Sequence, residues 1–266
     1  MLEKIIVPVD FSQEAENALW FAAEIGKRKS VPLSIIHCLS ESESRSEEEK
    51  KIKDLKEKLT LTFGSELACD WELTDMDLVH AIKNRTLNPM NHLLVMGTKG
   101  ASGLKRILIG SNTVRVISEI KTPVLVIPGV ARFSDFVKKG KNRVVLASDL
   151  EEIKDESGMN FFEEFLKLMN EPKLRILNVR PKNTTLDYEK RLLRKSLISA
   201  FGEVADTEKA TVFSNNILHG IQFYLEKNED TGLIVMISKD TGGLFQRHFT
   251  HEMAAMTHYP LLILNE

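Results

Sequence analysis

The heptapeptide Lys4-Ile5-Ile6-Val7-Pro8-Val9-Asp10 is a short, continuous apolar run that ends in a carboxylate. Continuous rather than alternating apolarity is typical of a parallel strand that is covered on both faces. Helix-like and strand-like runs alternate after it, with helices expected at 13–28, 52–63, 78–82 and 112–120 and strands at 32–38, 67–73, 92–96 and 123–128. Such alternation predicts βαβ units and a mostly parallel sheet.

The same pattern starts again in the second half of the chain. Arg143-Val144-Val145-Leu146-Ala147-Ser148-Asp149 copies the first heptapeptide in character, including its terminal aspartate. Later apolar runs at 174–179, 233–236 and 259–264 answer the second, fourth and fifth strands in the same order. Four matched landmarks at about one offset indicate an internal duplication, with a single large sheet as the alternative. We therefore expect two α/β domains, 1–131 and 141–266, each Rossmann-like with a mostly parallel five-stranded sheet and helices on both faces.

Composition limits the classes of function. The 266 residues include 36 Lys and Arg against 38 Asp and Glu, and this near-balance argues against nucleic-acid binding, which needs a basic surplus. The two cysteines, Cys38 and Cys69, form no Cys-x-x-Cys and favour a reducing compartment. With no signal peptide at the start and no apolar run of about 18 residues, we expect a cytoplasmic protein that does not contact membranes.

A glycine-containing segment between the fourth strand and the next helix is the candidate site. Gly97, Gly100 and Gly110-Ser111 lie where glycines let the backbone approach an anion and where free N–H groups at a helix start point toward it. In an open parallel sheet this place is at the carboxyl ends of the strands, so Asp10 can reach the same ligand. The alternative is that the glycines only make a tight strand-to-helix connection. The segment is not a Walker A loop, because it has no Gly-Lys-Ser/Thr.

The spacing Gly-x2-Gly-x9-Gly-Ser resembles the signature of the ATP-binding branch of the universal stress protein family, closely over residues 1–131 and loosely over 143–266. This resemblance implies the strand order 3-2-1-4-5 in each domain. It also implies a site for ATP or ADP, with or without Mg²⁺. Asp10 and Pro8 would lie beside the base and ribose, Cys38 would offer backbone groups to the adenine, and Met96 would pack against the nucleoside. The ribose and phosphates would be surrounded by Gly97, Lys99, Gly100, Gly110, Ser111 and Asn112. Lys99 stands where the family often has Arg. A lysine in this place would form less directional hydrogen bonds than an arginine.

The second half departs from that signature. Aligned on the fourth strand, Ile237 replaces Gly97, Asp240 replaces Gly100, and Thr250-His251 replaces Gly110-Ser111. A β-branched side chain and a carboxylate both oppose phosphate binding, so the second domain is expected to be degenerate. Asp149 would then be structural, for instance a cap of the next helix.

Two other groups of residues invite a functional interpretation. His248, His251 and His258 suggest a metal site, but no carboxylate or cysteine completes a recognisable ligand set, which favours a solvated or capping role. The run Glu47-Glu48-Glu49-Lys50-Lys51 is interpreted as the solvated face of a helix start.

The leading hypothesis for function is a stress-response or signalling protein that binds an adenine nucleotide as a regulatory ligand and is not an enzyme, although slow ATP hydrolysis is compatible with it. The alternatives are a slow ATPase or adenylyl-transferring enzyme, and an interaction scaffold without a ligand. The last strands of the two domains, 124–127 and 261–264, are apolar edges that need cover. Family topology implies that they pair in an intramolecular pseudo-dimer, with a further homodimer or an unknown protein partner left open.

Overall fold

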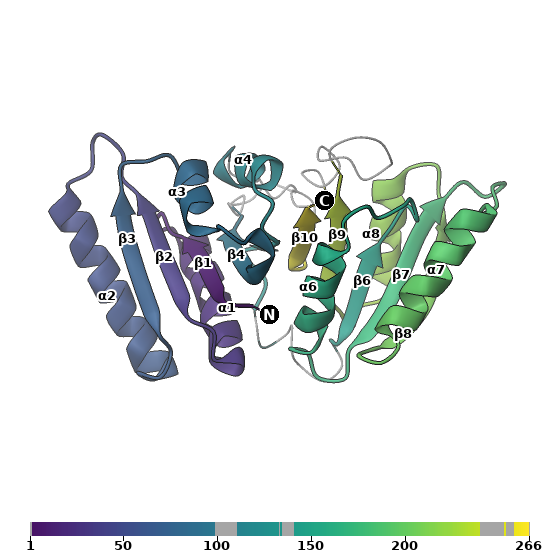
Figure 1. Cartoon of the computed structure of the whole chain (residues 1–266), viewed down its shortest axis with the longest axis horizontal. Helices are drawn as coiled ribbons and strands as arrows, with labels where there is room; N and C mark the ends of the chain where they lie inside the picture. The colour runs from purple at the N-terminus through teal and green to yellow at the C-terminus, as the bar shows by residue number, and fades with distance from the viewer. Residues whose placement is uncertain are drawn as a thin grey trace. The chain divides into compact units, whose positions relative to one another are not determined.

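The structure, a computed structural model of the whole chain, describes residues 2–98, 111–132, 134, 141–239, 253 and 258–265. The chain folds as two compact units, Met1–Phe133 and Ser134–Glu266. Each unit is a parallel sheet with its own helices, and Figure 1 shows the order of the elements along the chain.

In the first unit, strands and helices alternate as the sequence pattern predicts. Its strands are β1 (Lys4–Pro8), β2 (Leu33–Cys38), β3 (Cys69–Thr74), β4 (His92–Gly97) and β5 (Val124–Ile127). Its helices are α1 (Gln13–Lys29), α2 (Arg45–Phe63), α3 (Leu78–Arg85), the short 3-10 helix η1 (Pro89–Asn91) and α4 (Ser111–Glu119).

The strands of the first unit lie in the order β3-β2-β1-β4-β5, and every pair is parallel. Because crossovers between parallel strands are right-handed, α1 and α2 cover one face of this sheet and α3 and α4 the other. Contacts agree, since α1 packs on α2 and α3 packs on α4. The interiors of β1, β2, β4 and β5 are buried, as expected for a sheet with two covered faces, while the edge strand β3 is only partly buried.

The second unit repeats this plan. Its strands are β6 (Arg143–Ala147), β7 (Lys173–Arg180), β8 (Asp206–Phe213), β9 (Thr231–Ser238) and β10 (Leu261–Asn265), and its described helices are α6 (Ser157–Leu166), α7 (Tyr188–Phe201) and α8 (Ile217–Lys227). The strands of this unit lie in the order β10-β9-β6-β7-β8. If each unit's strands are numbered from one to five, both units have the order 3-2-1-4-5. All its pairs are parallel too. The predicted fold, two α/β domains with strand order 3-2-1-4-5, is confirmed.

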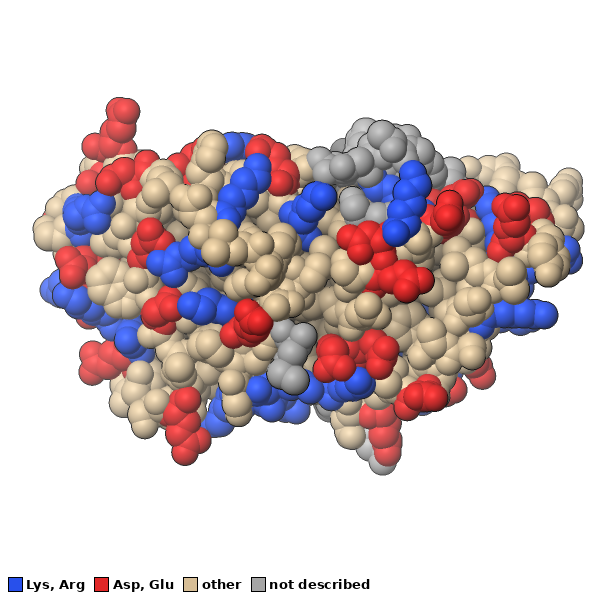
Figure 2. All heavy atoms as spheres, in the orientation of Figure 1, with Lys and Arg blue, Asp and Glu red and all other residues tan. Residues whose placement is uncertain are grey.

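Charges are mixed over the surface. On the face drawn in Figure 2, the Lys and Arg side chains are interspersed with Asp and Glu among the residues described there. Within the described part of the chain, no helix combines the length and apolar character that crossing a bilayer requires.

Candidate functional site

A cavity of about 180 Å³ opens at the carboxyl ends of β1, β2 and β4. This edge, between β1 and β4, is where the direction of the crossovers reverses and where open parallel sheets bind ligands. Six of the ten residues assigned to the site from sequence line it: Pro8, Asp10, Cys38, Met96, Gly97 and Asn112. Ser111 begins α4, while Lys99, Gly100 and Gly110 lie outside the described residues. The cavity also has lining residues that sequence reasoning did not assign: Val9, Ser12, Glu14, Ala15, Ile36, His37, Leu78 and Thr113.

Asp10 shapes the turn that leads from β1 into α1. Its Oδ1 accepts hydrogen bonds from the backbone N–H and the hydroxyl of Ser12, at 3.0 and 2.5 Å. Ser12 in turn caps α1, because its hydroxyl accepts from the backbone N–H of Ala15 at 3.2 Å. Between these two residues Phe11 has a φ of 57°, a left-handed conformation that the aspartate-centred turn supports. Asp10 is exposed and is therefore available to a ligand in the cavity.

The start of α4 forms the rim of the cavity on the side of β4. Asn112 and Thr113 line it, and the Thr113 hydroxyl donates to the carbonyl of Gly97 at 3.5 Å. The first backbone N–H groups of a helix have no partner within the helix, and the helix dipole makes this end favourable for anions. A phosphate group is the natural ligand for such a rim.

Gly97 is required by packing inside the unit. A Cβ placed on it would lie 2.7 Å from the carbonyl carbon of Glu14, overlap with that carbonyl's oxygen, and approach the backbone nitrogen of Ala15 to 3.1 Å. The last residue of β4 therefore lets the first turn of α1 sit directly on the strand. Sequence reasoning assigned this glycine to the ligand, and the contact adds a second reason for it.

Cys38 contributes no ionised thiol to the cavity. Burial, with smaller contributions from the negative charges of Asp77 and Glu72, raises the pKa of its thiol to about 11. A neutral thiol is neither an activated nucleophile nor a ready metal ligand at neutral pH.

His37, immediately before Cys38, links the second strand to the first. Its ring nitrogen Nδ1 lies 2.7 Å from the carbonyl oxygen of Val9, and because a carbonyl only accepts, Nδ1 must carry the hydrogen. In the second unit Asn178 holds the same position, and its side-chain nitrogen donates to the carbonyl of Ser148 at 3.0 Å. The sequence analysis missed both residues. The aligned strands would have paired His37 with Asn178, two polar side chains inside apolar runs.

The turn after β6 repeats the turn after β1, but its carboxylate is covered. Asp149 Oδ1 accepts from the backbone N–H of Glu151 at 3.1 Å, and Leu150 has a φ of 58°. Lys239, the residue aligned with Lys99, places its Nζ 3.8 Å from Asp149 Oδ1 and donates to the carbonyl of Glu152 at 2.9 Å. Asp149 is 5% exposed and Lys239 9%, so the second unit fills this place with its own ion pair.

The expectation that Asp149 caps the next helix is wrong. Helix α6 begins at Ser157, and its N-cap residue is Glu156, well beyond the turn that Asp149 supports. In the first unit α1 begins only three residues after Asp10, with its first turn against Gly97. The later helix start in the second unit accompanies Ile237, whose side chain would collide with a turn placed as in α1.

The interpretation of residues 47–51 as a solvated face is wrong for Glu48, which is 2% exposed. The reason is helical spacing: Glu48 precedes Ile52 by four residues and so falls on the buried stripe of α2 that continues with Leu55, Leu59 and Phe63. The remaining residues of the run are exposed or half-buried. The stripe was visible in the sequence, but the acidic neighbours on both sides concealed its first member.

Comparison with known proteins agrees with this architecture. Residues 1–128 match the sequence model of the Universal stress protein family. The chain is 27% identical over 154 residues to universal stress protein MJ0577 of Methanocaldococcus jannaschii, a similarity that covers 48% of this chain and 95% of that protein.

Solved structures resemble the full length of the chain. A universal stress protein from Archaeoglobus fulgidus covers 98% of this chain and is itself covered to 98%, with a TM-score of 0.74 and 17% identity. A functionally unknown protein from Pseudomonas aeruginosa covers 99% of this chain and is covered to 92%, with a TM-score of 0.63 and 12% identity. At these identities the two structures support the fold and nothing finer.

Proposed function

We propose, on the premise that the first half of this chain belongs to the universal stress protein family, that its first unit binds ATP or ADP as a regulatory ligand and that its second unit does not. The observation that carries this proposal is the cavity at the carboxyl ends of β1, β2 and β4, with the start of α4 on its rim. An exposed carboxylate on one side and a helix N-terminus on the other suit a ribose hydroxyl and a phosphate, respectively.

The second unit is proposed to stay empty because its matching place is occupied. The ammonium group of Lys239 lies beside Asp149, so a ligand would have to displace a buried ion pair. Ile237 adds a β-branched side chain where the first unit has no side chain at all.

The nucleotide is proposed to set conformation or the affinity for a partner in a stress response rather than to be turned over. The neutral thiol of Cys38 supplies no nucleophile, and the Asp10 carboxylate is already engaged by the backbone N–H and hydroxyl of Ser12. Steady-state turnover of ATP by the purified full chain tests this point. A rate well above about one per minute, far closer to ordinary enzyme turnover, would favour an ATPase or adenylyl-transferring enzyme instead.

The site itself is tested with Asn112→Asp. The added negative charge suits the first turn of a helix, so α4 should remain folded, while the same charge repels phosphates at the rim. Calorimetry should show that ATP binds about tenfold more weakly, about 1.4 kcal/mol, while adenosine binding is unchanged.

Two controls make this result specific. Adenosine, which has no phosphate, reports whether the base and ribose part of the site survives in the variant. Lys121→Glu changes charge at an exposed position after α4 and should leave ATP affinity within about twofold. If the Asn112→Asp protein binds ATP like the unmodified chain, the start of α4 does not contact the phosphates.

A further inference from the structure

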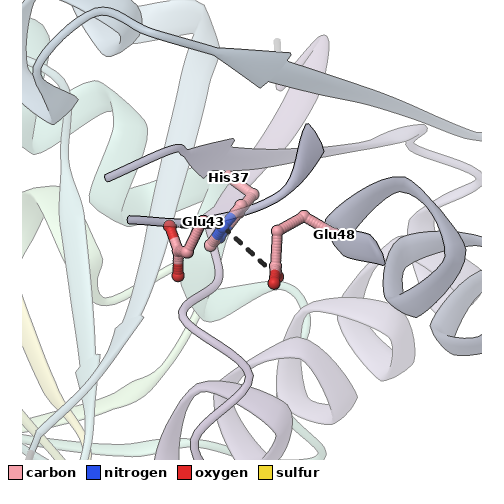
Figure 3. A group of neighbouring side chains, drawn as sticks. All are labelled: His37, Glu43 and Glu48. Atoms are coloured by element: carbon pink, nitrogen blue, oxygen red, sulfur yellow. Dashed lines mark ion pairs between the residues drawn. The ribbon is translucent and has the colours of Figure 1, made fainter. Parts of the chain in front are cut away.

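The geometry points to a second site in the first unit: we propose that His37, Glu43 and Glu48 bind one divalent transition-metal ion, with zinc as the best fit. His37 comes from β2, Glu48 from the first turns of α2, and Glu43 from the loop between them. Figure 3 shows the three side chains converging from these places. Among the described residues, this is the only group of at least three such side chains whose ligand atoms all lie within 4.8 Å of one another.

The distances leave a place for an ion. His37 Nε2 lies 3.7 Å from Glu43 Oε2 and 3.7 Å from Glu48 Oε2, which is too long for a hydrogen bond to either carboxylate. Nitrogen and oxygen ligands at zinc bond lengths of about 2.1 Å stand about 3.4 Å apart in a tetrahedral arrangement. Each of the two histidine–carboxylate distances therefore exceeds the zinc value by only about 0.3 Å, and all three ligand atoms lie within 4.8 Å of one another.

Two buried atoms of this group have no hydrogen-bond partner. They are His37 Nε2 and Glu48 Oε2, on residues that are 4% and 2% exposed. Buried polar atoms are almost always hydrogen-bonded, so two unsatisfied atoms that face each other indicate a binding site between them. A cation satisfies both atoms at once.

The surroundings of His37 match those of a metal ligand. Its Nδ1–H donates to the carbonyl of Val9 at 2.7 Å, which in the neutral ring leaves the lone pair on Nε2 aimed at the carboxylates. Metal-binding histidines almost always donate their other ring N–H to a carbonyl or carboxylate in this way. The ring is also fixed by Phe11, whose centroid lies 4.7 Å away.

The two carboxylates are likewise held in place. The backbone N–H of Ser40 donates to Glu43 Oε2 at 2.7 Å, and Lys51 Nζ donates to Glu48 Oε1 at 2.6 Å, which leaves Glu48 Oε2 for the ion. One imidazole with two carboxylates suits zinc and its first-row neighbours better than magnesium or calcium, which prefer oxygen ligands alone.

The second unit supplies the natural comparison. Asn178 stands in place of His37 and keeps the hydrogen bond to the preceding strand, but it offers no imidazole nitrogen. The proposed site adjoins the nucleotide cavity through His37, which lines both, whereas Glu43 and Glu48 do not line that cavity. The three ligands come from this chain alone, so the metal proposal does not depend on the proposed nucleotide function.

The test is metal titration of the full chain after chelator treatment and without nucleotide. Zn²⁺ binding is followed by calorimetry and Co²⁺ binding by visible absorption. The unmodified chain should bind one equivalent, and His37→Asn, which copies Asn178, should weaken that binding at least tenfold with the fold retained. Glu48→Gln, which keeps the shape but removes the charge, should weaken it similarly and covers the case in which His37→Asn fails to fold.

His92→Asn is the matched control. The ring Nδ1 of His92 also faces a backbone carbonyl, that of Asn88 at 2.8 Å, but His92 belongs to no ligand group among the described residues. This variant should bind Zn²⁺ and Co²⁺ like the unmodified chain. No binding by the unmodified chain would overturn the proposal and leave His37 as a buried partner of two carboxylates. Equal binding by His37→Asn and Glu48→Gln would place any bound metal elsewhere and overturn it too.

Discussion

The turns after β1 and β6 share their backbone geometry and hydrogen bonding but differ in the exposure of their carboxylates. In both, the carboxylate at the end of the strand accepts the backbone N–H two residues on, and the residue between adopts a left-handed conformation, Phe11 in one and Leu150 in the other. After β1 the carboxylate stays exposed beside a cavity, whereas after β6 it is buried under Lys239. The comparison teaches that a duplicated fold can keep the geometry of the turn at this edge while one copy covers the carboxylate with its own lysine side chain.

The largest loss of stability is expected when Gly97 of the first unit is replaced by isoleucine, the residue at the matching position of the second unit. Gly97→Ile places a branched side chain against the backbone of Glu14, which cannot move without displacing the first turn of α1. We expect a loss of about 3 kcal/mol in the free energy of unfolding, together with loss of nucleotide binding. Urea denaturation followed by circular dichroism measures it.

The control for this change is Ile237→Val, at the matching position of β9. It should lower the free energy of unfolding by only about 1 kcal/mol. If Gly97→Ile were as stable as the unmodified chain, the packing of α1 on β4 would not be the reason for the glycine.

A smaller effect is expected from removing the internal cation of the second unit. Lys239→Met removes the ion pair between Lys239 and the buried Asp149 carboxylate and the hydrogen bond from Lys239 to the carbonyl of Glu152. We expect a loss of about 2 kcal/mol in the free energy of unfolding, measured in urea. Lys173→Met, at an exposed position, should change this free energy by less than about 0.5 kcal/mol. Equal effects of the two changes would mean that Lys239 does not stabilise the covered turn.

The smallest change in unfolding free energy is expected at the cationic residues that begin the central strand of each unit, Lys4 of β1 and Arg143 of β6. Arg143 binds Asp230 through two nitrogen–oxygen contacts of 2.7 and 3.0 Å, while Lys4 makes a single contact of 2.9 Å with the more exposed Asp70. Replacing Arg143 by Met should cost about 1 kcal/mol of unfolding free energy, and replacing Lys4 by Met about 0.5 kcal/mol. Unfolding of both variants at pH 7 checks this order.

The Arg143 effect should depend on pH. Partial burial acts to raise the pKa of Asp230, but the hydrogen bonds and charge of Arg143 outweigh it and hold that pKa below its usual value. A lowered pKa adds stability above the ordinary aspartate pKa, and this stability is lost as the pH falls through the folded-state value. The difference between the unmodified chain and Arg143→Met should be full at pH 6 and shrink below about pH 4. A difference that stays constant down to pH 2 would contradict a role for the ionised pair.

The fold could be predicted from sequence because the repeated heptapeptide and continuous apolar runs specify buried parallel strands directly. Much of the candidate site followed from the same reasoning, since the carboxyl ends of neighbouring strands must share an edge, and Asp10, Cys38 and Met96 indeed meet there. Lys99, Gly100 and Gly110 remain predictions, because they lie outside the described residues.

The rest depends on contacts that no local pattern encodes. The collision that explains Gly97 involves Glu14, far away in the sequence, and the ion pair with Asp149 involves Lys239, the residue that follows β9. Glu48 was misread because local charge was weighed above its place on the apolar stripe of α2.

Hydrogen–deuterium exchange on the intact chain, with and without saturating ATP, tests the central claim most directly, because it reports which of the two edges holds the nucleotide. The account predicts slower exchange at the carboxyl ends of β1, β2 and β4 and in the first turn of α4, with no change at the ends of β6, β7 and β9. Equal protection of both edges, or protection at the second alone, would contradict it.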